Sequence, residues 1–382
     1  MNNAQLRRAI GAILLLVAVA ASGPALAACA APDAAPGDLP AATPESVSMA
    51  PEPLCALDAM LDQETALNVH GLLILRHGKL VFEKYLARKD APWGKDPGVY
   101  PYDAAALHDM RSISKSVVGL LVGIAIDRGL IKSVDDPVFD YLPAYADLKT
   151  PENSAIRISD LLTMTAGLKA DEDVPYQHPV NSERLVATAP DPYRFALGRE
   201  LTFKPGTHWV YDGGSTMILS KVLQQVSGKS LTGFAEESLF SPLGITTFEW
   251  IGLKKSGEPA AYGSLRLRPR DLAKIGQLVL DNGAWQGKQI VSADWIKAAT
   301  TARQDGWFPM RYGYHWWVGT EMGAKRTKVD WVGGIGIGGQ RVFVLPKQDV
   351  VVVVTAGMYD EDRQMAVPFD ITTQYVLPAV TP

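Results

Sequence analysis

The sequence is poor in features that mark several large classes of protein. Cysteine occurs only twice in 382 residues, at Cys29 and Cys55, so neither a disulfide framework nor a cysteine-rich metal site can hold the fold together. Positive charge is not in excess, because 37 Lys and Arg stand against 41 Asp and Glu, whereas a nucleic-acid-binding surface needs clustered basic residues. The apolar runs at residues 9–21 and 116–126 are shorter than the about 20 residues that span a bilayer. We therefore expect neither a nucleic-acid partner nor a membrane-spanning helix.

The motifs of several common enzyme classes are also missing. No G-x-S-x-G is present, so the nucleophile of an α/β-hydrolase has no candidate. H-E-x-x-H is absent and the six histidines are dispersed, which predicts no zinc site. Gly334, Gly336 and Gly339 spell G-x-G-x-x-G, but a predicted strand follows them, where a dinucleotide site needs a helix. We expect neither a cofactor nor a metal.

The N-terminus has the three regions of a secretory signal peptide over residues 1–28. Two arginines precede an apolar core, and small residues follow. Two interpretations of the cleavage site remain open. Cleavage after Ala25-Leu26-Ala27 keeps both cysteines, and a Cys29 to Cys55 disulfide can then form in an oxidising compartment. Leu26-Ala27-Ala28-Cys29 resembles a bacterial lipobox, in which Cys29 carries lipid and Cys55 is a free thiol. Both predict an exported protein, either periplasmic or held at the bacterial envelope membrane only by that lipid.

The rest of the chain predicts a tether followed by one α+β unit. Residues 29–54 are rich in proline and alanine, which is typical of an extended linker, and residues 55–382 form the globular part. β-Hairpins are predicted at residues 71–85 and 341–355, because β-branched and apolar runs flank short turns there. The region between them, about residues 131–300, reads mainly as helices. We expect a central antiparallel sheet built from both chain ends, flanked by helices, with a helical lobe inserted in the middle.

One predicted helix has a charge at an unfavourable place. Ser112-Ile113-Ser114-Lys115 precedes eleven uncharged residues that predict a helix buried in the core. Lys115 would lie at the positive end of the helix dipole and away from water, and both effects should lower the pKa of the lysine. Ser112, three residues earlier, shares its helix face. A serine beside a lysine that can lose its proton is a nucleophile beside its base. A helix-capping serine followed by a surface lysine would give the same S-x-x-K pattern, so the motif alone does not distinguish a catalytic pair from a structural one.

The order of motifs resembles the serine β-lactamase and penicillin-binding superfamily. S-x-x-K is followed about 100 residues later by Trp209-Val210-Tyr211-Asp212-Gly213-Gly214, and then by a glycine-rich strand near the C-terminus. The likeness is greatest to the branch of class C β-lactamases, family VIII carboxylesterases and 6-aminohexanoate-dimer hydrolases. Tyr312-Gly313-Tyr314-His315-Trp316-Trp317 is most similar to the last of these. The resemblance covers about residues 71–355 and implies the β-lactamase/transpeptidase fold.

The resemblance also implies roles for individual residues. Ser112 would attack a carbonyl carbon and form an acyl-enzyme, while Lys115 and Tyr211 move its proton. When Trp331-Val332-Gly333 is set on the family's K-T-G, the oxyanion hole consists of the backbone N–H groups of Ser112 and Gly334.

Two departures from the family pattern narrow the substrate. Gly213 stands where the Tyr motif usually has an asparagine that binds an acylamino group, and Trp331 replaces the lysine of K-T-G. Both losses disfavour an anionic acylamino substrate, and Trp331 would offer an apolar or stacking wall instead. Residues 171–176 form an acidic loop that suits an amine-bearing substrate if it borders the cleft, although a solvated loop is the alternative.

These departures predict a serine hydrolase, an esterase or amidase, that acts on an ester or linear amide of a small molecule. One alternative is a class C-type β-lactamase or DD-peptidase. Another is an envelope protein that binds peptidoglycan without turnover. The acyl group, the leaving group, the oligomeric state and the physiological role are left open by the sequence.

Overall fold

The computed structural model describes residues 39–93, 95–359 and 361–382. The predicted signal peptide and Cys29 lie outside these residues, so export, lipidation and the disulfide stay predictions. Among the described residues, no helix combines the length and apolar character needed to cross a membrane.

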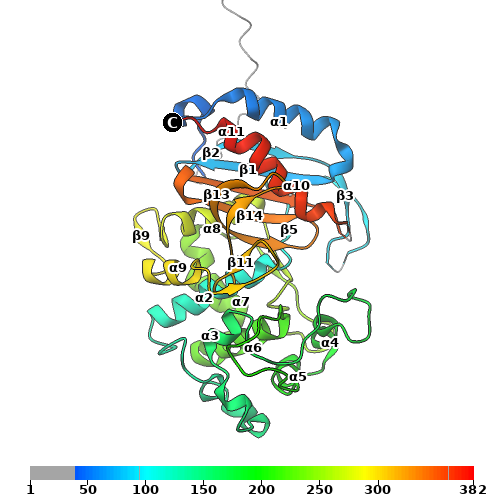
Figure 1. Cartoon of the computed structure of the whole chain (residues 1–382), viewed down its shortest axis with the longest axis vertical. Coiled ribbons are helices and arrows are strands. Elements are labelled where there is room, and N and C mark those ends of the chain that lie inside the picture. The colour runs from blue at the N-terminus through cyan, green and yellow to red at the C-terminus, as the bar shows by residue number, and fades with distance from the viewer. Residues whose placement is uncertain (1–38, 94, 360) are drawn as a thin grey trace, which may run out of the picture.

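An eight-stranded antiparallel sheet lies at the centre of one half of the molecule and uses both ends of the chain (Figure 1). Its strands, in spatial order, are β10 (Gln304–Asp305), β11 (Arg311–Tyr312), β12 (Trp317–Met322), β13 (Thr327–Gly336), β14 (Gln340–Leu345), β15 (Val350–Ala356), β1 (Val69–Arg76) and β2 (Lys79–Tyr85). Both predicted hairpins are present, as β1–β2 and β14–β15. The first turns at His77 and Gly78, both with positive φ.

Apolar side chains alternate along the central strands, so both faces of the sheet are covered. Leu73 and Leu75 of β1 belong to one hydrophobic cluster, whereas Leu72 and Ile74 belong to a second cluster on the opposite face. The second cluster includes residues of α1 (Pro51–Gln63), α10 (Arg363–Ile371) and α11 (Leu377–Ala379). The first includes α2 (Ile113–Asp127) and α8 (Pro269–Leu280). The sheet is therefore the middle of three layers, as the fold prediction required.

The other elements form the second half of the molecule and its connections (Figure 1). The helices are α3 (Ile158–Leu162), α4 (Ser182–Thr188), α5 (Pro192–Leu197), α6 (Gly213–Ser227), α7 (Leu231–Ala235) and α9 (Ala293–Ala299). The short strands are β3 (Arg88–Asp90), β4 (Gly98–Tyr100), β5 (His108–Asp109), β6 (Glu249–Trp250), β7 (Leu265–Leu267), β8 (Ala284–Trp285) and β9 (Lys288–Gln289). Residues 131–300 are mainly helical, but α8 lies against the sheet, with Gly276 directed at Val342 and Val351.

The predicted tether is wrong for the part of it that the structure describes. Residues 39–54 do not run free as an extended linker, since Ala41 pairs with Leu80 and helix α1 already begins at Pro51. Leu39, Val47 and Leu54 are buried. The proline content did not indicate a linker here, because proline is also favourable in the first turn of a helix. Backbone N–H groups in that turn make no hydrogen bond within the helix, so the missing N–H of proline costs nothing.

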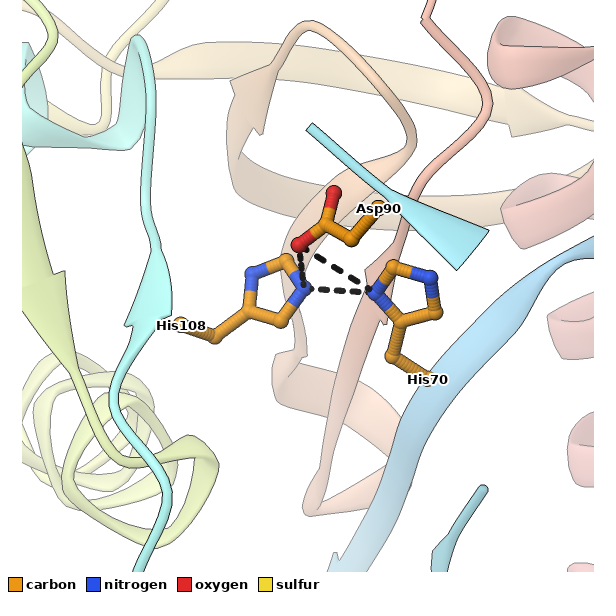
Figure 2. Close-up of side chains that lie close together, drawn as sticks. All are labelled: His70, Asp90 and His108. Atoms are coloured by element: carbon orange, nitrogen blue, oxygen red, sulfur yellow. Dashed lines mark hydrogen bonds and ion pairs between the residues drawn. The ribbon is translucent and has the colours of Figure 1, made fainter. Parts of the chain in front are cut away.

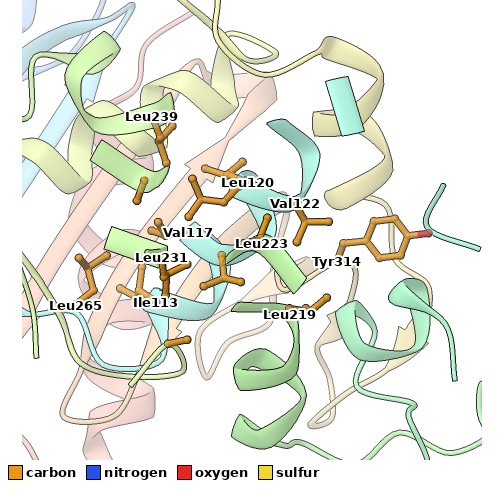
Figure 3. Close-up of a cluster of buried hydrophobic side chains, with 14 of the residues drawn as sticks. Ile113, Val117, Leu120, Val122, Leu219, Leu223, Leu231, Leu239, Leu265 and Tyr314 are labelled. Atoms are coloured by element: carbon orange, nitrogen blue, oxygen red, sulfur yellow. The ribbon is translucent and has the colours of Figure 1, made fainter. Parts of the chain in front are cut away.

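Helix α2 is buried between the sheet and the helical lobe along all but its last two residues. Its residues from Ile113 to Ala125 are all shielded from solvent. Figure 3 shows Val117 and Leu120 of α2 among Leu219 and Leu223 of α6. This packing confirms the predicted core helix, and it fixes the positions of the residues at the N-terminus of α2.

Candidate active site

Ser112 lies immediately before α2, at a sharp turn after strand β5. β5 pairs with β7, and two residues after its end the chain passes through Arg111, whose φ of 50° is unusual for a residue with a side chain. Ser112 occupies the N-cap position of α2 but caps no backbone N–H with its hydroxyl. The hydroxyl instead borders a cavity of about 1010 Å³. The turn and the buried helix together hold the serine at a cavity wall.

Lys115 is fully buried one helical turn beyond Ser112. Its Nζ donates a hydrogen bond of 3.1 Å to the Ser112 Oγ and another of 3.0 Å to the backbone carbonyl of Tyr262. The ammonium group also lies 4.7 Å from the centre of the Tyr211 ring. The predicted pair of a serine and a buried lysine is therefore formed, and the surface lysine of the alternative interpretation is absent.

Tyr211 approaches this pair from a separate segment, directly before α6. Its side chain interacts with both Ser112 and Lys115. The next residue, Asp212, caps α6 by accepting hydrogen bonds from the N–H groups of Gly214 and Ser215. Arg199 holds the same carboxylate through two contacts of 2.7 and 2.8 Å. This buried ion pair sets the place where Tyr211 enters the cavity.

The pKa of Lys115 moves in the direction opposite to the prediction. Burial pushes the pKa of Lys115 down, but Tyr211, Glu172 and Glu183 push it up by more, so the pKa lies above its ordinary value. Burial raises the pKa of Tyr211 by more than Lys115 lowers it. The resting site therefore holds a protonated lysine beside a neutral phenol. Burial and the helix dipole are local effects that lower this pKa, whereas Glu172 and Glu183, which raise it, come from a distant part of the chain.

Two carboxyl groups border the same cavity as Ser112. Glu172 belongs to the predicted acidic loop, which lies at the cavity, and Glu183 lies on α4. Burial and Glu183 raise the pKa of Glu172 to about 8, against the effect of Lys115. Burial also raises the pKa of Glu183. Glu183 was not identified from the sequence, because nothing in residues 182–188 distinguishes it from an ordinary acidic residue in the first turn of a helix.

The strand that was expected to complete the site is β13. Gly333 and Gly334 lie in β13, where Gly334 packs on Ile113, and neither residue borders the cavity. The following residues, Ile335 and Gly336, do border it. The assignment of the Gly334 N–H as an oxyanion donor therefore stays a prediction.

Trp331 is not the open stacking surface that was predicted. Only 1% of its surface is exposed, and although it reaches the cavity wall, its ring packs edge-on against Phe343 and Phe369. Its indole N–H donates to the backbone carbonyl of Glu321 at 2.8 Å. The alternation of β13 directs Trp331 into the second hydrophobic cluster. Replacement of the family lysine has thus produced a core residue.

Other aromatic residues form the accessible wall of the cavity. The ring centre of Trp307 lies 5.0 Å from that of Tyr211 and 4.9 Å from that of Trp317. Trp307 is 38% exposed and the adjacent Phe308 is 88% exposed. No sequence motif distinguishes these two residues, because they belong to a loop whose position depends on the strands on either side.

The sheet and three residues, Ser112, Lys115 and Tyr211, together define the β-lactamase-fold class of hydrolases. The serine precedes a buried helix, the lysine follows it by one helical turn, and the tyrosine precedes a second helix. Residues 57–370 match the family model named Beta-lactamase, and the chain belongs to this family.

Similar proteins within this family have different activities. The chain is 27% identical to the 6-aminohexanoate-dimer hydrolase of Paenarthrobacter ureafaciens, over 82% of this chain and 80% of the relative. Among solved structures, EstCE1, a hydrolase with promiscuous acyltransferase activity, matches with a TM-score of 0.68 at 16% identity, over 87% of this chain and 99% of the other. The octameric penicillin-binding protein homologue from Pyrococcus abyssi matches with a TM-score of 0.64 at 18% identity, over 87% and 78%. The two structures support the fold alone.

Proposed function

We propose that this protein is a serine hydrolase that forms an acyl-enzyme on Ser112 and cleaves an ester or a linear amide of a small substrate. The observation that carries the proposal is the 3.1 Å contact between the Lys115 Nζ and the Ser112 Oγ at the wall of a large cavity. A serine hydroxyl is a weak nucleophile until a neighbouring base takes its proton. The buried lysine and the tyrosine beside it provide that base as a pair.

The protonation states of Lys115 and Tyr211 determine how they can act as the base. Because the resting Lys115 is protonated, one proton has to leave Lys115 and Tyr211 before they can accept the proton of Ser112. The Ser112 Oγ then bonds to the carbonyl carbon, and the leaving alcohol or amine takes the proton back as its bond to that carbon breaks. Water, deprotonated by the same pair, releases the acid from the acyl-enzyme. General acid–base help of this kind is worth about 10² to 10⁴-fold in rate.

The cavity favours a substrate with an apolar part and no carboxylate near Ser112. Trp307 and Phe308 present exposed aromatic surface, while Glu172 and Glu183 add acidic groups. An anion would be repelled from these two carboxyl groups whenever they are ionised. The similarity to an aminohexanoate-dimer hydrolase supports an amide of an amino acid.

Labelling by a fluorophosphonate probe tests the nucleophile. Wild-type protein and the control Ser227→Ala, altered at the half-buried last residue of α6, should label equally, while Ser112→Ala should not label. Equal labelling of wild type and Ser112→Ala would exclude an acyl-enzyme on Ser112. Absence of labelling in both, together with binding to peptidoglycan, would instead favour the envelope-binding alternative.

A substrate panel then separates the remaining candidates. Turnover of p-nitrophenyl esters and linear aliphatic amides should exceed turnover of nitrocefin and of D-alanyl-D-alanine peptides. The reverse order would favour the class C-type β-lactamase or DD-peptidase. It would also show that the loss of the asparagine and of the K-T-G lysine has not changed the specificity.

We also propose that the protein is exported and that the signal peptide ends before residue 29. Mass spectrometry of the mature N-terminus distinguishes the two interpretations. A lipid-modified Cys29 identifies an envelope lipoprotein, an unmodified chain beginning at Ala28 identifies a soluble periplasmic protein, and an intact leader in the native host contradicts export.

A further inference from the structure

Three residues from three different strands converge on one point in the interior of the protein (Figure 2). His70 comes from β1, Asp90 from β3 and His108 from β5. Their exposed fractions are 0%, 5% and 1%. The His70 Nδ1 lies 2.8 Å from the His108 Nε2, and the Asp90 Oδ2 lies 3.9 and 3.7 Å from these two nitrogens. Two imidazole nitrogens and one carboxylate oxygen thus face each other in the core.

The other nitrogen of each ring determines which tautomer is present. The His70 Nε2 lies 3.0 Å from the backbone carbonyl of Lys89, and the His108 Nδ1 lies 3.1 Å from the carbonyl of Asp109. A carbonyl oxygen only accepts, so both of these nitrogens carry hydrogen. Each neutral ring therefore turns a lone pair, with no hydrogen, toward the other ring at 2.8 Å. Such an arrangement is unfavourable unless something positive lies between the nitrogens.

The carboxylate of Asp90 is also held in place by hydrogen bonds. The Asp90 Oδ1 accepts a hydrogen bond of 2.8 Å from the N–H of Ala91, and the hydroxyl of Tyr102 donates to Oδ2. The Tyr102 ring also stacks on His70, with ring centres 4.7 Å apart. Metal-binding histidines typically donate their second N–H to a backbone carbonyl, and ligating carboxylates are themselves hydrogen-bonded. All three side chains have these supporting contacts.

The distances between the two nitrogens and the carboxylate oxygen are compatible with a metal ion bound to all three atoms. The nearest point equidistant from three atoms that are 2.8, 3.7 and 3.9 Å apart lies about 2.0 Å from each of them, which is within the usual range of Zn²⁺ distances to imidazole nitrogen and carboxylate oxygen. A larger ion such as Ca²⁺ prefers longer distances and oxygen ligands. Two neutral imidazoles and one carboxylate carry a total charge of −1. A divalent cation bound to them would therefore keep one positive charge.

We propose that His70, Asp90 and His108 bind one divalent transition-metal ion, with Zn²⁺ as the best fit. The ion would join three strands that belong to three separate sheets. β5 leads through Met110 and Arg111 to Ser112, so the ion would fix the segment that carries the proposed nucleophile. It would not touch the substrate, because none of its three ligands borders the cavity with Ser112. Its role is to position the chain and to stabilise the fold.

Metal content and cobalt spectroscopy test the site on the purified full-length protein. After treatment with a chelator and dialysis, we expect the wild type to take up one equivalent of Zn²⁺ and to unfold at a higher temperature with Zn²⁺ than without it. Co²⁺ should bind with the visible absorption of a low-coordinate nitrogen and oxygen site, and Zn²⁺ should displace it. Because loss of a supporting contact alone typically weakens metal binding about 10- to 100-fold, Asp90→Asn and His108→Gln should each weaken Zn²⁺ binding by about 100-fold or more.

His77→Gln is the matched control. His77 lies at the surface and pairs with Asp349 at 2.6 Å, so its loss removes a histidine without affecting the cluster, and binding should be unchanged. A wild type that takes up no stoichiometric metal overturns the proposal even if the two ligand variants fail to fold. Uptake that persists in Asp90→Asn and His108→Gln but falls in His77→Gln also overturns it. A proton shared between the two rings, seen as a low-field proton resonance in protein that binds no cation, would assign the cluster to an imidazole–imidazolium pair instead.

Discussion

The carboxyl group of Glu172 accepts a hydrogen bond of 2.6 Å from the backbone N–H of Gly213, and it occupies the space that a side chain at position 213 would need. A Cβ atom at this position would lie 3.1 Å from the Glu172 Oε1 and 3.0 Å from the Tyr262 Cγ. An asparagine, as in related Tyr motifs, would therefore require Glu172 or Tyr262 to move. An acidic group from another loop stands in its place, beside Tyr211.

Gly213→Ala should disturb the site despite adding only one methyl group. The methyl group would force Tyr262 or Glu172 to move, and overpacking of this kind costs about 1 to 3 kcal/mol. Because Tyr262 holds Lys115 through its carbonyl, we expect kcat on a p-nitrophenyl ester to fall by about tenfold, in line with a small displacement of a general base. Gly263→Ala is the control, since its Cβ would meet Trp93 at an ordinary 3.6 Å. Equal effects of the two variants would contradict the proposed steric conflict.

The pH dependence of the reaction should depend on Glu183. Glu183 raises the pKa of Lys115, which must lose a proton before the pair can accept one from Ser112. Activity should therefore rise with pH, and Glu183→Gln should lower the pKa of Lys115 and move this rise to lower pH. The measurement is kcat/KM against pH with an uncharged ester. Asp173 also borders the cavity but is not one of the main groups that raise the pKa of Lys115, so Asp173→Asn should leave the profile in place. A shift to higher pH in Glu183→Gln would contradict the assignment.

Those parts of the fold that depend on neighbouring residues in the chain could be predicted from the sequence. The hairpin of β1 and β2 follows from two apolar runs around His77 and Gly78, and α2 follows from eleven uncharged residues after Lys115. Ser112 and Lys115 meet because they are one helical turn apart, which is a local relationship. Such patterns remain valid in any fold that keeps the helix.

Relationships between distant segments could not be predicted in the same way. His70, Asp90 and His108 have no common spacing, so their convergence depends on how β1, β3 and β5 are placed. Glu183 reaches Lys115 only because α4 packs beside the acidic loop. The orientation of Trp331 depends on the register of β13, in which a shift by one residue would turn the ring to the other face of the sheet.

Asp212 should be important for stability as well as for the position of Tyr211. Asp212→Ala would remove the cap of α6 and leave the buried Arg199 without its carboxylate, which typically costs about 3 to 5 kcal/mol. Asp191→Ala is the control. Asp191 caps α5 through the N–H groups of Tyr193 and Arg194 but pairs with no buried cation, so the expected loss is about 1 kcal/mol. Chemical denaturation measures both, and similar losses would mean that the ion pair with Arg199 contributes little.

Trp307 and Trp331 should respond differently to truncation, because Trp307 is exposed at the cavity wall whereas Trp331 is almost fully buried. Trp307→Ala should raise KM for an ester with an aromatic acyl group by about tenfold, since stacking and burial of part of a ring are worth about 1 to 1.5 kcal/mol, with the free energy of unfolding little changed. Trp331→Ala should lower the free energy of unfolding by about 3 to 5 kcal/mol, as expected for a large core side chain. Michaelis–Menten kinetics with aromatic and acetyl esters, combined with denaturation, separates the two effects. If Trp331→Ala leaves stability intact and raises KM selectively for aromatic esters, Trp331 is the substrate wall after all, and the register of β13 differs from the one described.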